Sequence, residues 1–339
     1  MKAFVKTVNG NFADVNFYLA WKGFNEMGYS VVLMDDVDKA EITIDTPVFA
    51  GTRTFDEIVT KLVPSYKRLE TYPEELRPLL NRKLELTTLK EAKKRFAVDE
   101  RPMFVKPVIG KQFQGGLWKS FLDLIPLVNK PDDAEVYVAE PIKFESEFRC
   151  YINDREIVGV KHYTGDWQRP IQESTITEAV RMFKHAPIAY SIDLGVVNSY
   201  PTPIDTLVEV NDGTSLGNYG LDSIYYGEML VARWFEIVAD HEVKTDIDSK
   251  LKEIEKYHSK DYIENERKWY YEKKEWSDYR FSHKDFMVED KSERLKIDAL
   301  KDYIEDARKE YTSESDHHTE RLNNNYDEVM AIKYSKPSL

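Results

Sequence analysis

The chain has 339 residues, of which 42% are hydrophobic and 13% aromatic, so it is long enough and apolar enough to build two or three domains with buried cores. This composition excludes a chain that is disordered throughout. The formal net charge of −13 argues against a protein that coats nucleic acid or an anionic membrane, but it is compatible with a local basic cleft for a small phosphorylated ligand.

Cysteine content and hydropathy indicate the compartment. The single cysteine, Cys150, cannot form a disulfide within the chain, which is typical of a reducing environment. The first residues, Met1 to Lys6, lack the apolar run of a signal peptide, and no stretch reaches the roughly 20 apolar residues of a membrane span. We therefore expect a cytoplasmic protein without a membrane partner.

The first 80 residues alternate between strand and helix patterns. Short apolar runs predict strands, and longer amphipathic segments between them predict helices. The predicted strands are 3–8, 29–34 and 48–50, and the predicted helices are 16–27 and 55–62. This alternation predicts an α/β domain with a parallel sheet over residues 1–80.

A different, α+β pattern covers residues 81–240. The predicted strands are 84–89, 103–105, 135–139, 148–152, 157–160, 192–197 and 206–210, and the predicted helices are 90–96 and 224–238. The segment 166–183 is rich in Gln, Glu, Arg and Thr.

The last 99 residues, 241–339, carry 20 Lys and Arg and 25 Asp and Glu. Their apolar residues step by three and four at Ile297, Leu300, Ile304, Ala307 and Tyr311, which predicts an amphipathic helix. We expect a charged helical extension. It either packs one stripe against the body of the protein or binds a partner or substrate.

An apolar strand ending at Lys106 runs into a loop with glycines at Gly110, Gly115 and Gly116 and a second lysine, Lys111. Glycines let backbone N–H groups approach phosphate oxygens closely, and a lysine adds positive charge. The loop is not a Walker A motif, because no Gly-Lys-Ser/Thr follows at the required spacing. An ordinary turn with a surface lysine would show the same pattern.

A second strand pattern, Val136 to Ala139, is stopped by Pro141. Backbone groups left unpaired at such a strand end can contact an adenine edge. Glu147 and Arg149 follow two residues apart, so they share one face of the next strand, where they could contact ribose hydroxyls and phosphate oxygens. A surface Glu/Arg pair is the alternative.

Lys161 ends a third apolar strand and could bring a second cation to the same site. A lysine that caps a strand edge is an equal alternative. The neighbouring His162 has no Cys or His at metal-ligand spacing, so we expect no zinc site there.

Acidic residues within apolar strands mark a fourth pattern. Asp193 lies in one such strand, and Glu209 and Asn211 lie two apart in the next. A buried acid is costly unless it is paired or coordinated. Hard oxygen donors that share one face suit Mg²⁺. An Asx turn at Asn211 explains the end of the strand but neither of the two acids.

The order of these four patterns, from Arg82 to Val238, resembles the ATP-grasp superfamily. The most specific elements are Glu209-x-Asn211 with Asp193 upstream, and Glu140 followed seven residues later by Glu147. The motifs Phe-x-Ser-Glu-Phe-Arg and Val-Gly-x-Lys-x-Tyr are similar to those of a poorly characterised clade of the superfamily that is common in phages and bacteria.

The resemblance implies an α+β ATP-grasp domain at 81–240, with ATP between two lobes, a preceding α/β domain at 1–80 and the charged helical extension at 241–339. It assigns nucleotide contacts to Lys106, Lys111, Gly115, Gly116, Val138, Ala139, Glu140 and Glu147, catalytic charge neutralisation to Arg149 and Lys161, and Mg²⁺ binding to Asp193, Glu209 and Asn211. It also implies one more cation a strand earlier, for which Arg82 and Lys83 are both candidates. It implies further that variable loops and the preceding domain contact the substrates, and the segment 166–183 is a candidate for such a loop.

The implied activity is an ATP- and Mg²⁺-dependent ligase that activates a carboxylate as an acyl phosphate and joins it to an amine or another nucleophile. Small-molecule or peptide carboxylates and amines are the expected substrates. Phosphoryl transfer without ligation, or a non-catalytic nucleotide-binding or interaction protein, are the alternatives. A nucleic-acid partner is not expected, because the charge is acidic and the chain has no Lys-x-Asp-Gly motif.

Overall fold

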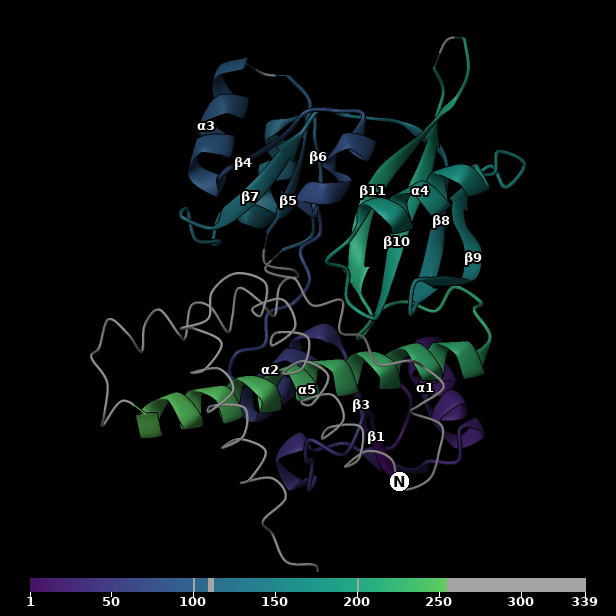
Figure 1. The fold of residues 1–339 in the computed structure, drawn as a ribbon. Helices are drawn as coiled ribbons and strands as arrows, with labels where there is room; N and C mark the ends of the chain where they lie inside the picture. Colours follow the sequence, from purple (N-terminus) through teal and green to yellow (C-terminus); the bar gives the residue numbers. More distant parts are fainter. Residues whose placement is uncertain (100, 109–112, 200, 255–339) are drawn as a thin grey trace, which may run out of the picture. The chain divides into compact units, whose positions relative to one another are not determined.

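A computed structural model describes all residues of the chain except 100, 109–112, 200 and 255–339 (Figure 1). The predicted amphipathic helix at 297–311 lies outside the described residues. The chain forms two compact units, of which the first contains Met1–Ala50, Glu57–Lys67 and the chain from Gly227, and the second Gly51–Asp56 and Arg68–Tyr226. The predicted domain boundaries at residues 80 and 240 stay predictions.

The first unit contains a three-stranded parallel sheet, as its alternating sequence predicts. Its strands, in the order β2-β1-β3, are β1 (Lys2–Lys6), β2 (Ser30–Met34) and β3 (Val48–Phe49), and its helical elements include α1 (Val15–Glu26) and the short η1 (Val37–Lys39). Ala3, Phe4 and Val5 of the central strand are buried. Gly28, just beyond α1, has a φ of +84°, a conformation that glycine adopts at low cost at a helix end.

The long helix α5 (Ser223–Ile254) contributes a buried face to the first unit. A side chain at Gly227 would lie 2.9 Å from the backbone of Gly23 in α1, so the glycine permits this close helix approach. Trp234 is 1% exposed, and its indole N–H donates to the carbonyl of Ile44 at 2.8 Å. This indole is therefore both packed and hydrogen-bonded, as a buried tryptophan requires.

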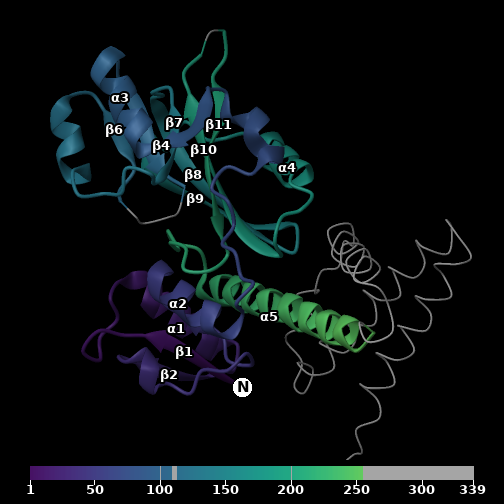
Figure 2. The same cartoon turned by 90° about the vertical axis from the view of Figure 1, so that its left-hand side faces the viewer.

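The second unit contains two four-stranded sheets (Figure 2). The first sheet is antiparallel, in the order β4-β7-β5-β6, and is made of β4 (Leu84–Thr88), β5 (Met103–Pro107), β6 (Gly116–Trp118) and β7 (Glu135–Ala139). Helix α3 (Leu89–Asp99) packs Leu89, Ala92 and Phe96 into the core of this sheet, and η3 (Phe121–Leu127) adds Leu127.

The second sheet is also antiparallel, in the order β11-β10-β8-β9. Its strands are β8 (Phe144–Asn153), β9 (Glu156–Gly165), β10 (Ala189–Val197) and β11 (Ile204–Asp212). Helices α4 (Glu173–Met182) and η2 (Glu74–Leu80) pack onto the face that carries Phe148, Cys150 and Ile152. The prediction of a loop over 166–183 is therefore wrong for Glu173–Met182, where Ile176, Ala179 and Val180 at helical spacing form a buried stripe.

Strand β11 contains a β-bulge that orients its polar residues. Asp193 of β10 pairs with Glu209, but the next residue, Leu194, pairs with Leu207, so Val208 is the extra residue. The bulge lets Leu207 and Val210 both face the core although they are three apart. Glu209 is thereby placed on the opposite face, level with Asp193.

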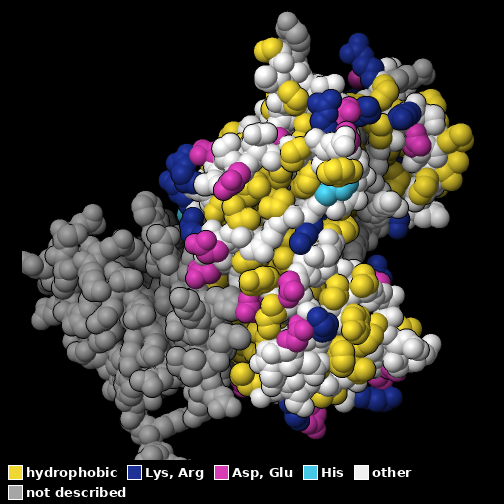
Figure 3. Space-filling model, turned by 90° about the vertical axis from the view of Figure 1, so that its right-hand side faces the viewer, with side chains coloured by type: hydrophobic (Ala, Val, Ile, Leu, Met, Phe, Trp, Pro, Cys, Tyr) yellow, Lys and Arg dark blue, Asp and Glu magenta, His cyan; other side chains and the backbone are white. Residues whose placement is uncertain are grey.

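No helix in the described part of the chain has an apolar segment of the length that a membrane span needs. On the face drawn in Figure 3, the Lys and Arg side chains of the described residues lie among acidic and hydrophobic ones. This mixed surface agrees with the acidic net charge and shows no single basic area on that face.

We predict that Gly213→Ala destabilises the second unit by about 1–3 kcal/mol, because the new methyl group would lie 2.2 Å from the carbonyl oxygen of Ala189. Gly51→Ala is the matched control, since a methyl group there would meet no atom within 4 Å. Urea unfolding measures both. Equal midpoints for the two variants would contradict this close approach of β11 to β10.

Candidate nucleotide and metal site

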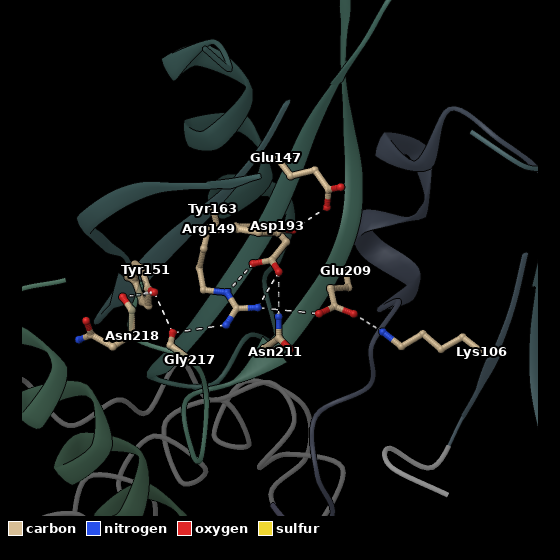
Figure 4. Close-up of polar contacts among 10 residues, drawn as sticks. All are labelled: Lys106, Glu147, Arg149, Tyr151, Tyr163, Asp193, Glu209, Asn211, Gly217 and Asn218. Carbon is tan, nitrogen blue, oxygen red and sulfur yellow. Dashed lines mark hydrogen bonds and ion pairs between the residues drawn. The ribbon is translucent and has the colours of Figure 1, made fainter. Parts of the chain in front are cut away.

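A buried ion pair between Arg149 and Asp193 forms the centre of the site (Figure 4). The two residues are register partners on β8 and β10, so their side chains leave the sheet on the same face. Arg149 Nε donates to Asp193 Oδ1 at 2.8 Å, and Nη2 donates to Oδ2 at 2.7 Å. Arg149 is 6% exposed and Asp193 1%, so this bidentate pair is shielded from water.

Burial and pairing act in opposite directions on the titration of these groups. Burial lowers the pKa of Arg149, but the hydrogen bonds and charge of Asp193 more than reverse this, and the pKa is raised. Burial raises the pKa of Asp193 to about 6, against the opposing effect of Arg149. The bidentate hydrogen bonds of the pair thus favour the charged form of both groups, against the effect of burial.

Glu209 and Asn211 of β11 lie beside this pair. Asn211 Nδ2 donates to Asp193 Oδ2 at 3.4 Å, which leaves the amide oxygen of Asn211 for another partner. Glu209 Oε1 lies 3.8 Å from Arg149 Nη2, and Glu209 Oε2 accepts a hydrogen bond from Lys106 of β5. Burial would raise the pKa of Glu209, but Lys106 and Arg149 lower it.

The chemistry of this donor set fits a magnesium ion only in part. Among the described residues, no three His, Cys, Asp or Glu side chains form a metal cluster, but the predicted set contains two carboxylates and an amide. Glu209 and Asn211 offer hard oxygen donors. Both oxygens of Asp193 accept from Arg149. Asp193 therefore orients Arg149 and Asn211, and Glu209 and Asn211 remain as the oxygen donors for a metal.

Lys106 is held between a glycine and an aromatic ring. A side chain at Gly115 would lie 3.1 Å from Cβ and Cγ of Lys106, so the glycine permits this approach of the loop. Lys106 Nζ lies 5.7 Å from the ring centre of Tyr72, a buried residue of the same unit. A side chain at Gly116 would meet no atom within 4 Å, and Lys111 lies outside the described residues.

Glu147, predicted to bind ribose, lies on the same face of β8 as Arg149. Its Oε2 accepts a hydrogen bond from the Tyr163 hydroxyl of β9 at 2.6 Å. Lys161 is the register partner of Arg149 and is partly buried, and among the described residues it makes no hydrogen bond or ion pair. Its ammonium group is therefore available to an anion on this face.

The predicted adenine-binding strand end joins the two sheets. Val138 and Ala139 of β7 lie between β4 and β5, and both side chains are buried. Glu140 is exposed, and its N–H donates to the carbonyl of Lys83 at 3.4 Å. Only residues 140–143 separate β7 from β8, so this short connection joins the two sheets.

A loop after β11 covers Arg149, and the sequence patterns assigned it no role. The carbonyl of Gly217 accepts from Tyr151 at 2.8 Å and from Arg149 Nη1 at 3.4 Å. The Tyr219 ring centre lies 4.8 Å from the Arg149 guanidinium, and this ring stacks on Tyr163. The glycines of this loop are the sequence feature that could have predicted its close approach to Arg149. No feature of the local sequence indicates that Tyr72 contacts Lys106.

The structure thus brings together most of the predicted residues. One face of the second sheet carries Glu147, Arg149, Lys161, Asp193, Glu209 and Asn211, and Lys106 reaches it from the first sheet. Among the described residues, no hydrogen bond or ion pair joins Val138, Ala139 or Glu140 to this group. The roles assigned to these residues in nucleotide binding, metal binding and catalysis stay predictions.

A family model matches the part of the chain that carries this site. Residues 79–229 match the family model of an ATP-grasp domain, R2K clade family 2, and this segment is somewhat less than half of the chain. No curated protein matches the chain. The resemblance drawn from the sequence patterns is confirmed by the family model.

Solved structures are also similar to the chain. A RimK domain ATP-grasp protein from Sphaerobacter thermophilus shares 15% identity and a TM-score of 0.46, with 68% of this chain and 99% of that chain covered. The D-alanine–D-alanine ligase of Bacillus anthracis shares 14% and 0.42, with 71% and 99% covered. The macrocyclase MdnC of Microcystis aeruginosa, bound to its precursor peptide MdnA, shares 16% and 0.42, with 68% and 99% covered.

The two sheets of the second unit and the family match together define an ATP-grasp domain. Within that superfamily, the matched family is the second family of the R2K clade.

We predict that Asp193→Asn destabilises the nucleotide-free protein by about 3–5 kcal/mol, because Arg149 would remain buried without its counter-charge. Asp132→Asn breaks a pair with Lys93 in which the carboxylate is 62% exposed, and it should cost less than about 1 kcal/mol. The double variant Arg149→Met/Asp193→Leu should recover much of the loss. Urea unfolding measures all three, and equal effects of the two single variants would refute the central role of the pair.

Proposed function

We propose that the protein is an ATP- and Mg²⁺-dependent ligase that joins a carboxylate to an amine or another nucleophile through an acyl phosphate. The observation that carries the proposal is the meeting of Lys106 from the first sheet with Arg149, Asp193, Glu209 and Asn211 on the second. Cations and hard oxygen donors on facing elements are what a magnesium–triphosphate complex requires.

The charges in this group suggest how nucleotide and metal enter together. Lys106 and Glu209 neutralise one another in the nucleotide-free protein. If a phosphate alone bound Lys106, Glu209 would lose its ion-pair partner. If a cation alone bound Glu209, Lys106 would lose its ion-pair partner. Binding of both at once satisfies both side chains, so we expect nucleotide and Mg²⁺ to bind cooperatively.

The chemistry needs no protein nucleophile. The substrate carboxylate oxygen attacks the γ-phosphorus, and the bond to the β-phosphate oxygen breaks to release ADP. The amine then attacks the acyl carbon, and phosphate leaves with the electron pair while the amine loses a proton. Lys106, Lys161 and the Arg149 pair would stabilise the charge on the transferred group. Bound Mg²⁺, held by Glu209 and Asn211 beside Asp193, would add charge neutralisation.

We predict that Glu209→Gln abolishes the gain in nucleotide affinity that Mg²⁺ provides, because the amide keeps the shape but not the charge of a metal ligand. Calorimetric titration with a non-hydrolysable ATP analogue, with Mg²⁺ and with EDTA, measures the gain. In EDTA the variant should bind at least as tightly as the parent. A full Mg²⁺ gain in this variant would contradict the metal assignment.

We predict that Lys106→Met lowers nucleotide affinity at least about tenfold, both with Mg²⁺ and in EDTA, since a charge-assisted contact to phosphate is lost. Lys93→Met is the matched control. Lys93 also pairs with an acid, Asp132, and its side chain is 24% exposed against 22% for Lys106. An affinity equal to that of the control would exclude Lys106 from the phosphate site.

ADP release tests the reaction itself. The purified protein is supplied with MgATP and with sets of carboxylic acids, amino acids and peptides, and release of ADP is followed by a coupled assay. We expect turnover that needs both a carboxylate and an amine and that is lost in Glu209→Gln. Turnover with a single hydroxyl substrate, and a phosphorylated product, would indicate phosphoryl transfer instead.

A further inference from the structure

Arg82 lies in the short segment between η2 and β4, and its side chain reaches across to β11. Nη1 donates to the carbonyl of Leu207 at 2.7 Å and to that of Leu80 at 3.1 Å, and Nη2 lies 3.5 Å from the carbonyl of Val208. Val208 is the extra residue of the β-bulge, directly before Glu209. The guanidinium thus binds the main chain at the bulge.

The neighbours of Arg82 hold it in this position. Asn81 Nδ2 donates to the carbonyl of Asp205 at 3.2 Å and to the Thr206 hydroxyl at 3.3 Å, so both residues of the segment attach to β11. The guanidinium lies 5.9 Å from the ring centre of Phe144 and interacts with Tyr72. Burial lowers the pKa of Arg82, so this side chain is in a partly desolvated setting.

A bulge leaves main-chain groups without their ladder partners, and the planar fork of an arginine can bind several carbonyls at once. Removal of the fork would leave the carbonyls of Leu207 and Val208 to find other donors, and the strand could then return to a regular register. A one-residue change of register would turn the Glu209 side chain toward the other face of the sheet.

We propose that Arg82 is a positioning residue that fixes the Val208 bulge and thereby aims Glu209 at the metal and nucleotide. This inference rests on the proposed function. It differs from a phosphate contact by Arg82, because the hydrogen bonds of the guanidinium lead to the main-chain carbonyls of Leu80, Leu207 and Val208 and to the Tyr72 side chain, which also lies beside Lys106. The residue would therefore act through Glu209 and not on the phosphates.

The test compares Arg82→Met, Arg82→Lys and the control Arg181→Met, whose arginine lies on the surface of α4 and pairs with Glu178. Each full-length variant is titrated calorimetrically with a non-hydrolysable ATP analogue, once in EDTA and once with Mg²⁺, and Mn²⁺ binding to each complex is followed by its paramagnetic spectrum. Arg82→Lys keeps the charge and stem without the fork, so it carries the test if Arg82→Met does not fold.

We expect Arg82→Met to bind the analogue in EDTA within about twofold of the parent, but to lose about tenfold or more of its Mn²⁺ affinity and its Mg²⁺-dependent gain. Arg82→Lys should fall between parent and Arg82→Met. A loss in EDTA as large as that of Lys106→Met would overturn the inference in favour of a phosphate contact. Metal affinities equal to those of Arg181→Met would also overturn it.

Measurements on the parent protein distinguish a failure of this inference from a failure of the proposed function. If the parent binds no nucleotide in either buffer, the proposed ligase function fails, and the inference fails with it. If the parent shows the Mg²⁺ gain and Glu209→Gln loses it while Arg82→Met and Arg82→Lys keep it, only the role of Arg82 is refuted.

Discussion

The bidentate pair of Arg149 and Asp193 is the interaction on which the candidate site depends. Two charges buried in a sheet are tolerated only when they meet in good geometry and their remaining groups find partners. The remaining hydrogen bonds of the site supply those partners, from the Gly217 carbonyl on one side and the Asn211 amide on the other. The Tyr219 ring covers the guanidinium. The position of each neighbour follows from the need to satisfy this pair.

The two faces of the second sheet have different roles, one in the core and one in the candidate site. Alternate residues of β8 point to the core, where Phe148, Cys150 and Ile152 pack under α4 and η2, and the residues between them point to the site. Consecutive residues of one strand therefore face an apolar core on one side of the sheet and the charged site on the other. The bulge at Val208 is the one irregularity of β11, and it lies beside the residue that meets Lys106.

Strand periodicity explains why the sequence predicted much of this site. Glu147 and Arg149, and Glu209 and Asn211, are two residues apart, and each couple does share one face. The parallel sheet of the first unit and most strands of the second were predicted because their apolar runs are short and bounded by turns. Helix α4 was missed because its apolar stripe is interrupted by Thr, Glu and Arg.

Contacts between residues far apart in the chain could not be predicted from the sequence. No local pattern shows that Arg149 binds Asp193, 44 residues away, instead of standing free for phosphate. Tyr72 reaches Lys106 from 34 positions earlier in the chain. Strand order and register decide such contacts, and the Val208 bulge shifts them by one residue. Arg82 illustrates this limit, since its partners on β11 are 125 and 126 residues away.

The burial of Cys150 has a practical consequence. It is the single thiol of the chain, it is fully enclosed on the core face of β8, and burial raises its pKa. A thiol reagent can modify it only when the core between this sheet and the helices α4 and η2 opens, so the rate of labelling reports the opening of that core. The molecule therefore carries its own chemical probe one residue away from Arg149, without any engineered label.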